Sequence, residues 1–245
     1  MDLKGKVALV TGSAGNGIGR SIALTLAREG AKVAINYRKS KEQAQAIVDH
    51  IKARSGDAAA IKADVFHAEG CRNLVNATME HFGRIDICVV NPGAVWHPEP
   101  LDKLNSSAAL EDVRNEVAPF LHLMPLVLPQ MYERKWGRVI GIALLPPYES
   151  PAYSYNVGKA ARVQAMLQAR DQAWRNGVTV NVLCPGPVPA IESFAEAVEQ
   201  CEHGPAWRQR SNTSPQDIAE GVAYLCSNAG RFVTGCVLPF LFNSD

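Results

Sequence analysis

The fold of this chain is decided by the stretch Val7-Ala8-Leu9-Val10-Thr11-Gly12-Ser13-Ala14-Gly15-Asn16-Gly17-Ile18-Gly19-Arg20. Its apolar start predicts a strand, and the apolar spacing from Ile18 onward predicts a helix. The glycine-rich turn between them leaves backbone N–H groups unobstructed at the start of that helix, where the helix dipole adds partial positive charge. The glycines also permit a tight turn and a close approach of phosphates. The stretch therefore predicts a dinucleotide site, with an ordinary glycine-rich turn as the alternative.

Composition excludes several classes of function. The chain has 245 residues, enough for one large α/β domain, and its formal net charge is +1 without a long run of one sign. This balance argues against nucleic acid or a membrane surface as the main partner. We find no apolar run that could span a bilayer and no signal-peptide core, so we expect a cytoplasmic protein. Six scattered cysteines form no Cys-x-x-Cys pair, and no His, Cys and Asp cluster has metal-ligand spacing, so no metal is expected.

Apolar segments and helical patterns alternate six or seven times, which predicts a parallel, doubly wound α/β sheet with helices on both faces. Prolines 119, 125 and 129 lie in one predicted helix, which we expect to be bent or broken. The strands are predicted over residues 7–11, 32–37, 58–63, 85–90, 139–144, 179–183 and 237–241. The helices are predicted over residues 18–29, 40–53, 69–82, 108–133, 153–176, 192–201 and 215–226.

Ligands of such sheets bind beyond the carboxyl ends of the strands. The second strand ends in Asn36-Tyr37-Arg38, where an acidic residue would favour NAD. A guanidinium can instead hold a 2′-phosphate, so we expect NADP(H) rather than NAD(H); a solvated basic pair, Arg38-Lys39, is the alternative. Asp64, with Val65 beside it, is expected near the adenine, or it caps a helix. The segment Asn91-Pro92-Gly93 is expected near a ribose, or it is only a turn.

A possible reaction centre is the pair Tyr155 and Lys159. Four residues apart, the two side chains share one side of a helix. A lysine ammonium stabilises the phenolate and lowers the pKa of the tyrosine, which can then exchange a proton with a carbonyl or alcohol oxygen. Alone, the Tyr-x-x-x-Lys spacing is common, and a pair on a helix surface is its ordinary explanation.

In combination, these motifs resemble the short-chain dehydrogenase/reductase family, in particular its 3-oxoacyl-[acyl-carrier-protein] reductase-like members. The resemblance covers essentially the whole chain. It implies a single Rossmann-fold domain over residues 1–245 with seven parallel strands, a substrate-covering segment over residues 186–213, a small carbonyl or alcohol substrate, and a homotetramer or homodimer. The motifs that carry it are the glycine-rich turn, Asp64, Asn91-x-Gly93, Asn115, Tyr155-x-x-x-Lys159 and Pro185-Gly186.

The resemblance also implies roles for single residues. Tyr155 is the expected proton donor, Lys159 holds the nicotinamide ribose and tunes Tyr155, and Asn115 supports a water relay, unless it is only a polar residue on a helix surface. The residues expected to bind the cofactor are Gly12, Ser13, Asn16, Gly17, Ile18, Gly19, Asn36, Tyr37, Arg38, Asp64, Val65, Asn91, Pro92, Gly93, Tyr155, Lys159, Pro185, Gly186 and Val188.

The sequence also departs from that family. Relatives carry a serine where Leu144 stands, and losing one preorganised donor costs about 3 kcal/mol of transition-state stabilisation. Ser150 and Tyr148 are candidate substitutes, whereas Ser154 should point elsewhere. The missing serine leaves two interpretations open. One is an oxidoreductase with an unusual pocket. The other is a nucleotide-binding relative that has little or no redox activity or that catalyses another Tyr-assisted reaction. Further candidates, each equally explained by packing or solvation, are Trp96, His97, His122, Phe194 and Trp207.

Overall fold

A sheet of seven parallel strands forms the centre of the computed structural model, which describes residues 1–93, 98–144, 152–205 and 212–240. The strand order is β3-β2-β1-β4-β5-β6-β7, so the chain reverses its direction of winding between β1 and β4. This is the switch point at which such sheets bind ligands. The strands are β1 (Val7–Val10), β2 (Lys32–Tyr37), β3 (Ala58–Lys62), β4 (Ile87–Val90), β5 (Gly137–Ile142), β6 (Val178–Pro185) and β7 (Val237–Phe240).

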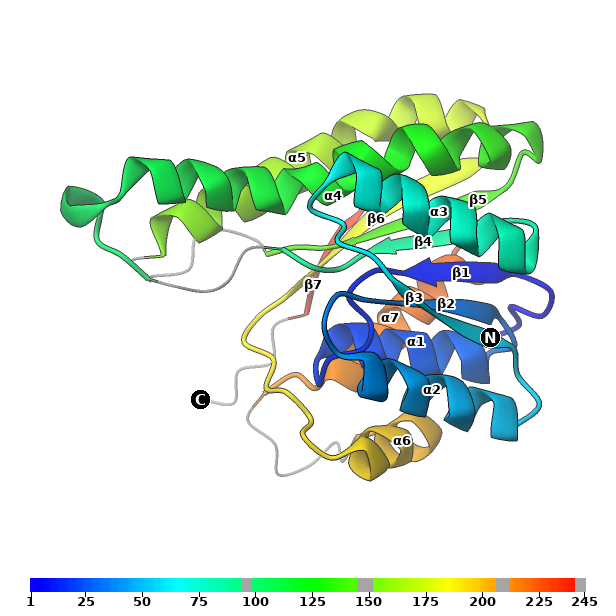
Figure 1. Cartoon of the computed structure of the whole chain (residues 1–245). Helices are drawn as coiled ribbons and strands as arrows, with labels where there is room; N and C mark the ends of the chain where they lie inside the picture. Colours follow the sequence, from blue (N-terminus) through cyan, green and yellow to red (C-terminus); the bar gives the residue numbers. More distant parts are fainter. Residues whose placement is uncertain (94–97, 145–151, 206–211, 241–245) are drawn as a thin grey trace.

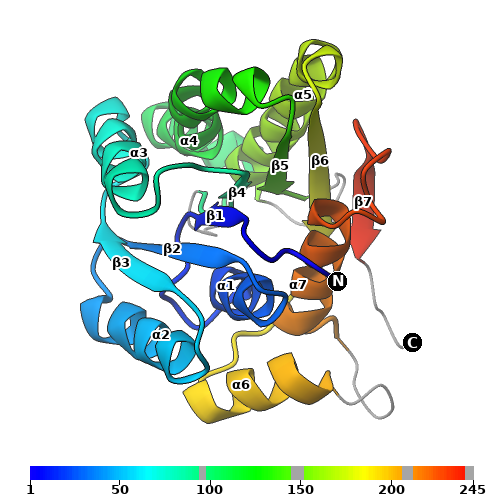
Figure 2. The ribbon, with the colours of Figure 1, turned by 90° about the vertical axis from the view of Figure 1, so that its right-hand side faces the viewer.

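Helices cover both faces of this sheet. Figure 2 shows α3, α4 and α5 on one face and α1, α2 and α7 on the other, with α6 outside α1. The predicted doubly wound α/β fold is therefore confirmed. The helices are α1 (Ile18–Arg28), α2 (Lys41–Ala53), α3 (Ala68–Phe82), α4 (Ser106–Glu133), α5 (Tyr153–Arg175), α6 (Phe194–His203) and α7 (Pro215–Cys226), and a short 3-10 turn, η1, spans Leu101–Lys103.

Burial of the central strands follows from this layering. Every residue of β1, β4, β5 and β6 is buried, as expected for strands that are covered on both faces. One apolar cluster, which includes Ile22 and Ile47, packs under α1, α2 and α7. A second cluster, which includes Leu123 and Met131, packs under α3, α4 and α5. Three strands differ from their predicted bounds by two residues: β4 begins at Ile87, β5 ends at Ile142, and β6 ends at Pro185.

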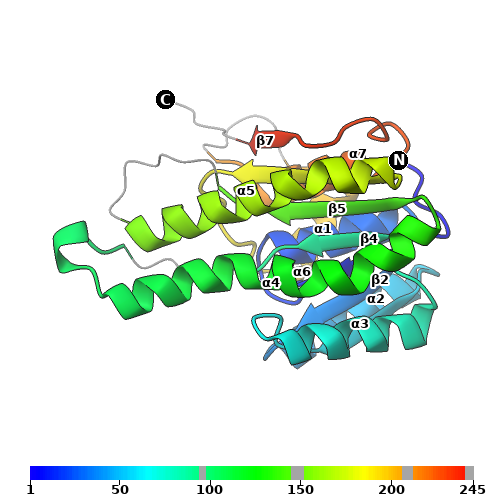
Figure 3. The same ribbon diagram turned by 90° about the horizontal axis from the view of Figure 1, so that it is seen from above.

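The long helix α4 is not broken at its prolines, so that part of our expectation is wrong. Pro125 and Pro129 are exposed, where water can pair with the carbonyls that each proline frees, while Pro119 is buried. Figure 3 shows α4 running beside α5, and its contacts with α5 and α3 support it along its length. Tertiary packing therefore outweighs the local cost of three prolines.

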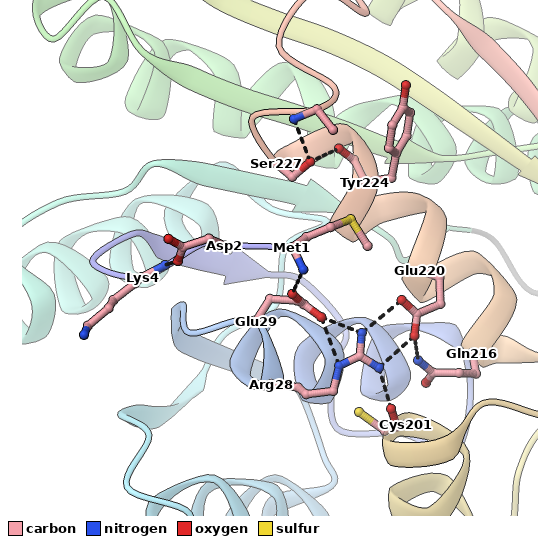
Figure 4. A network of polar contacts seen from close by, with 11 residues as sticks. Met1, Asp2, Lys4, Arg28, Glu29, Cys201, Gln216, Glu220, Tyr224 and Ser227 are labelled. Carbon is pink, nitrogen blue, oxygen red and sulfur yellow. Dashed lines mark hydrogen bonds and ion pairs between the residues drawn. The ribbon is translucent and has the colours of Figure 1, made fainter.

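A charged cluster anchors the helix α6, which belongs to the predicted substrate-covering segment. The guanidinium of Arg28 on α1 donates to Glu220 of α7 at 2.8 and 3.0 Å, and to the backbone oxygen of Cys201 on α6 (Figure 4). Arg28 also pairs with Glu29, which binds the N-terminal ammonium of Met1. The cluster thus joins α1, α6 and α7 on the same side of the sheet.

Candidate active site

A cleft of about 580 Å³ opens at the carboxyl ends of the central strands, the end toward which the arrows point in Figure 1. It lies beside the switch point between β1 and β4, as the topology predicts. Seven of the residues that we expected to bind cofactor meet there: Ile18, Asn91, Tyr155, Lys159, Pro185, Gly186 and Val188. The other lining residues are Ile142, Ala143, Leu144, Pro187, Pro189 and Asn212.

The Tyr155 and Lys159 side chains lie together on α5. The Lys159 ammonium is 5.0 Å from the centroid of the Tyr155 ring, and the lysine is only 7% exposed. Burial lowers the pKa of Lys159 to about 8; the Arg162 guanidinium acts in the same direction, and Glu116 opposes both. The lysine therefore changes its charge close to neutral pH.

A second buried pair lies behind Lys159. Glu116 of α4 is fully buried, with one carboxylate oxygen 3.1 Å from Lys159 Nζ and the other 3.0 Å from Arg162 Nη2. Sequence reasoning missed both Glu116 and Arg162. The available signal was that Glu116 is the only charged residue between positions 116 and 131, and that Arg162 stands three residues after Lys159, on the same helix face.

The predicted relay residue Asn115 precedes Glu116 on α4. Its side-chain oxygen is buried and makes no hydrogen bond to any part of the chain that the structure describes. The α4 residue that contacts Lys159 is Glu116. One residue along a helix is a turn of 100°, so the sequence motif alone could not decide whether Asn115 or Glu116 faces α5.

The glycine-rich turn has the form that a phosphate site needs. Gly12 has a φ of +59°, which favours glycine, and an added Cβ at Gly15 or Gly17 would meet nothing within 4 Å. The N-terminus of α1 has no side-chain cap and no acidic residue in its first turn. No side-chain cap therefore competes with an anion for the first backbone N–H groups of this helix.

Ser13 and Asn36 use their side chains to hold this turn in place. The Ser13 hydroxyl donates to the carbonyl of Val10, and the backbone N–H of Asn36 donates to that same hydroxyl. The Asn36 amide oxygen accepts from the backbone N–H of Gly12 at 2.9 Å, and its nitrogen donates to the carbonyl of Ala63. Both side chains shape the loop from inside.

Asn16 links the turn to the predicted substrate-covering segment. Its side-chain nitrogen donates to the Glu192 carboxylate at 2.7 Å, and its backbone carbonyl accepts from the backbone N–H of Ile191 at 2.9 Å. The Arg20 guanidinium donates to the carbonyl of Ile191. The glycine-rich turn therefore contacts a segment more than 170 residues away along the chain.

The end of β2 presents a basic side chain, as predicted. Arg38 Nη1 lies 3.5 Å from the Asp64 carboxylate, and the side chain is 54% exposed. Asp64 also accepts from the backbone N–H of Phe66, which agrees with its alternative role as a turn cap. Tyr37 is half-buried, and Val65 is buried.

The segment Asn91-Pro92-Gly93 follows β4 and brings Asn91 to the lining of the cleft. The Asn91 amide donates to the carbonyls of Thr11 and Gly12, each at 3.2 Å, so it braces the glycine-rich turn. A Cβ at Gly93 would clash with the Glu116 carboxylate. This glycine is therefore required for space.

A family model described as short chain dehydrogenase matches residues 6–200. The chain belongs to the short-chain dehydrogenase/reductase family. The resemblance stated from the motifs is thereby confirmed, and the enzyme class is an NAD(P)-dependent dehydrogenase or reductase.

Individual relatives agree with this assignment. The chain is 33% identical over 237 residues to the 3-oxoacyl-[acyl-carrier-protein] reductase FabG of Staphylococcus aureus, with 94% of each chain covered. A short chain dehydrogenase from Burkholderia cenocepacia, solved in complex with NADP, superposes with a TM-score of 0.84 at 29% identity and covers 99% of both chains. A 7α-hydroxysteroid dehydrogenase, solved with NADH and 7-oxoglycochenodeoxycholic acid, gives 0.84 at 28% identity, with 98% of this chain and 94% of that chain covered.

This dehydrogenase has an apolar wall where the sequence lacks the expected serine. Ala143 and Leu144 line the cleft, and among its described lining residues only Tyr155 carries a hydroxyl. Ser154 is buried and donates to the Asp112 carboxylate at 2.8 Å, so it is engaged outside the cleft, as expected. The other candidates, Tyr148, Ser150, Trp96, His97 and Trp207, lie outside the described residues.

The remaining candidates among the described residues lie outside the lining of the cleft. Phe194 packs edge-on against His50, outside the cleft lining, and His122 is half-buried on α4. All six cysteines are free, and Cys88 is fully buried, which raises its pKa to about 12. In the described parts of the chain, no three His, Cys, Asp or Glu side chains come together as metal ligands, and no helix is long and apolar enough to cross a membrane.

Proposed function

We propose that this dehydrogenase transfers hydride between NADP(H) and a carbonyl or secondary-alcohol substrate, with Tyr155 as the general acid and base. The observation that carries the proposal is that Tyr155 and Lys159 line one cleft, close to the uncapped N-terminus of α1. When bound, the nicotinamide ring supplies or accepts the hydride. The chain's own residues supply the proton and the fixed charge.

The residues around the glycine-rich turn fit a dinucleotide. The open face at Gly15 and Gly17 and the N-terminus of α1, which has no side-chain cap, would hold the pyrophosphate. The lack of an acidic side chain in the first turn avoids repulsion of that anion. Asn91, Pro185, Gly186 and Val188 would border the nicotinamide end, because they line the same cleft as Tyr155.

Tyr155 moves the proton in this proposal. A tyrosine has a reference pKa near ~10 and needs a nearby cation to stabilise its phenolate. Lys159, 5.0 Å from the ring centroid, provides that cation. An ammonium has three donors, and Glu116 takes one, which leaves two for the ribose hydroxyls of the cofactor. Tyr155 would donate to the oxygen during reduction and accept from it during oxidation.

The preference for NADP(H) rests on Arg38. Its contact with Asp64 is long, 3.5 Å, and the side chain is more than half exposed. Such a surface pair contributes at most about 1 kcal/mol, so the guanidinium can turn to a 2′-phosphate at little cost. A bidentate guanidinium–phosphate contact is stronger than this ion pair.

The substrate pocket is apolar beside Tyr155. Ile142, Ala143, Leu144 and Val188 favour an uncharged group next to the reacting carbon. Among the described lining residues no second hydroxyl is present to polarise the carbonyl, and a site without one would be about a hundredfold slower than a site that has one. The names of the relatives suggest which ketones to test first: 3-oxoacyl thioesters and 7-oxo steroids.

The experiment is NADPH oxidation against a panel of ketones, 3-oxoacyl thioesters and 7-oxo steroids, with wild type and Tyr155→Phe. We expect at least one substrate whose turnover depends on Tyr155. If every rate is the same for the two proteins, or no ketone is reduced, the reductase proposal fails.

A second function is a cofactor-binding protein without redox turnover. Two observations favour it: Leu144 stands at the expected serine, and Lys159 is tied to Glu116. It predicts NADP(H) binding by calorimetry with no turnover on the whole panel. A Leu144→Ser variant that gains turnover would support this alternative.

A further inference from the structure

Arg162 carries a fully buried guanidinium that donates to four backbone carbonyls and forms an ion pair with one carboxylate. Nε donates to the carbonyl of Glu116 at 2.6 Å, and Nη1 donates to the carbonyls of Ile142 at 2.8 Å and Asn91 at 3.4 Å. Nη2 donates to the carbonyl of Pro92 and lies 3.0 Å from the Glu116 carboxylate. Burying a cation is costly unless it is paired and fully hydrogen-bonded, so this place in the fold is built for arginine.

The acceptors of Arg162 join the elements that border the cleft. Asn91 and Pro92 follow β4, Ile142 ends β5, and Glu116 belongs to α4. Arg162 itself lies on α5, one turn after Lys159. The guanidinium therefore fixes the position of the Glu116 carboxylate relative to both strands.

Glu116 connects this guanidinium to the cleft. Its second oxygen accepts from Lys159 Nζ at 3.1 Å, and both acidic oxygens lie away from solvent. Two glycines make room for the side chain, since a Cβ at Gly93 would clash with the carboxylate and one at Gly158 would come within 2.8 Å of Glu116 Cγ. The carboxylate thus sits in a shaped space between two cations.

We propose that Glu116 is a positioning residue for Lys159, and that Arg162 holds the Glu116 carboxylate so that the lysine ammonium stays directed at Tyr155. The proposal rests on the function proposed above, in which Lys159 assists Tyr155. Arg162 and Glu116 neutralise each other, which leaves the charge of Lys159 to act on the cleft. Because the pair is anchored to the ends of two strands, the ammonium is held in place before any ligand binds.

The charges facing Lys159 determine its protonation. They are Glu116 from α4, Arg162 and Tyr155 from α5, and the Cys184 thiol from β6. Burial and Arg162 disfavour the ammonium, and Glu116 is the carboxylate that favours it. Removing only the Glu116 charge leaves two buried cations side by side, whereas removing only Arg162 leaves Lys159 with a carboxylate of its own.

The test is a titration of Lys159 itself, followed by the NMR shift of ¹³C-labelled lysine Cε and assigned with Lys159→Met. Glu116→Gln keeps the shape and removes the charge, so we expect the pKa of Lys159 to fall by more than about half a unit. Arg162→Gln should raise it by a similar amount. A change smaller than this, or in the opposite direction, in either folded variant overturns the proposal; if one variant does not fold, the other decides.

The matched control is Asp86→Asn, because Asp86 is a fully buried carboxylate between Arg84 and Arg134 that is outside the lining of the cleft. It should leave the titration of Lys159 unchanged. In an active enzyme, the alkaline limb of kcat/KM should move in the same direction as the NMR pKa for each variant. The NMR titration needs no turnover, so a loss of the proposed reaction would not be confused with a failure of this proposal.

Discussion

Two buried carboxylates, Asp86 and Glu116, each lie between two cations, at opposite ends of the sheet. Asp86 precedes β4 at the amino end, where it accepts from Arg84 at 2.5 Å and from the backbone N–H of Val7 at 2.9 Å. Glu116 lies at the carboxyl end, between Lys159 and Arg162. The arginine that completes the Asp86 cluster, Arg134, is partly exposed, as is Arg84, whereas Arg162 is completely buried.

The difference between these clusters lies in what the cations can reach. The cations of the Asp86 cluster reach water and hold the frame of β1, β4 and α4 together. In the Glu116 cluster, Lys159 lines the cleft beside Tyr155. The same chemical motif is therefore structural at one end of the sheet and, in our proposal, directs a functional group at the other.

The largest effect should come from the cleft itself. Tyr155→Phe removes the proton donor, so turnover should fall by about 10² to 10⁴. The variant should unfold at nearly the wild-type temperature, since phenylalanine keeps the ring of this half-buried residue. Steady-state NADPH oxidation and thermal unfolding measure the two quantities. If Tyr155→Phe instead lost its activity because it unfolds, the cleft end of the sheet would not differ in function from the structural end at Asp86.

The second prediction compares the two carboxylates directly. Glu116→Gln should lower the free energy of unfolding by about 3 kcal/mol, because Arg162 and Lys159 cannot turn to water. Asp86→Asn should cost roughly 1–2 kcal/mol, because Arg84 and Arg134 can. Urea unfolding of both variants provides the comparison. If both variants lost the same free energy of unfolding, burial of the cations would not explain a difference between the two clusters.

A third prediction extends the comparison to an exposed pair. Arg38→Ala should weaken NADPH binding about tenfold and leave NADH binding unchanged, because one charge-assisted contact to the 2′-phosphate is lost. The free energy of unfolding should change by less than about 0.5 kcal/mol. Calorimetric titration with both cofactors tests it. Equal weakening for NADPH and NADH would refute the role of Arg38 in cofactor choice.

The smallest effect is the pH dependence of the wild type. The pKa of Lys159 is lowered to about 8, so the ammonium is present below that pH and is lost above it. The rate of ketone reduction should therefore decrease as pH rises through about 8, and be about halved there. A pH–rate profile measures this limb. A constant rate up to pH 10 would show that the charge of Lys159 is not required.

Most of the fold could be predicted from the sequence because the strands and helices carry strong periodic signals. The strand 32–37 and the helix 215–226 match the structure at both ends. The helix α4 is continuous through its three prolines, whereas the sequence predicted a bent or broken helix. The prediction used only the local effect of proline and could not include the packing of α4 against α3 and α5. Boundaries shifted by two residues at β4, β5 and β6; after β5 the apolar run continues through Ala143 and Leu144, past the last residue of the strand.

The site could be predicted where a motif determines a backbone form or a helix face. The pair Tyr155 and Lys159 meets in the cleft because four residues make one turn of α5. The pairing of Glu116 with Arg162 could not be predicted, because it joins residues 46 positions apart across two helices. Ser13 and Asn36 were expected to bind cofactor, yet their hydrogen bonds hold the loop, which no spacing indicates.

The most direct measurement is hydride transfer itself, with NADPH deuterated at C4 of the nicotinamide on the transferred face. For a ketone that the enzyme reduces, our account predicts that mass spectrometry finds the deuterium on the carbinol carbon of the product, and that Tyr155→Phe forms this labelled alcohol far more slowly. An alcohol without the label, or bound NADPH that transfers none to any ketone of the panel, would contradict it.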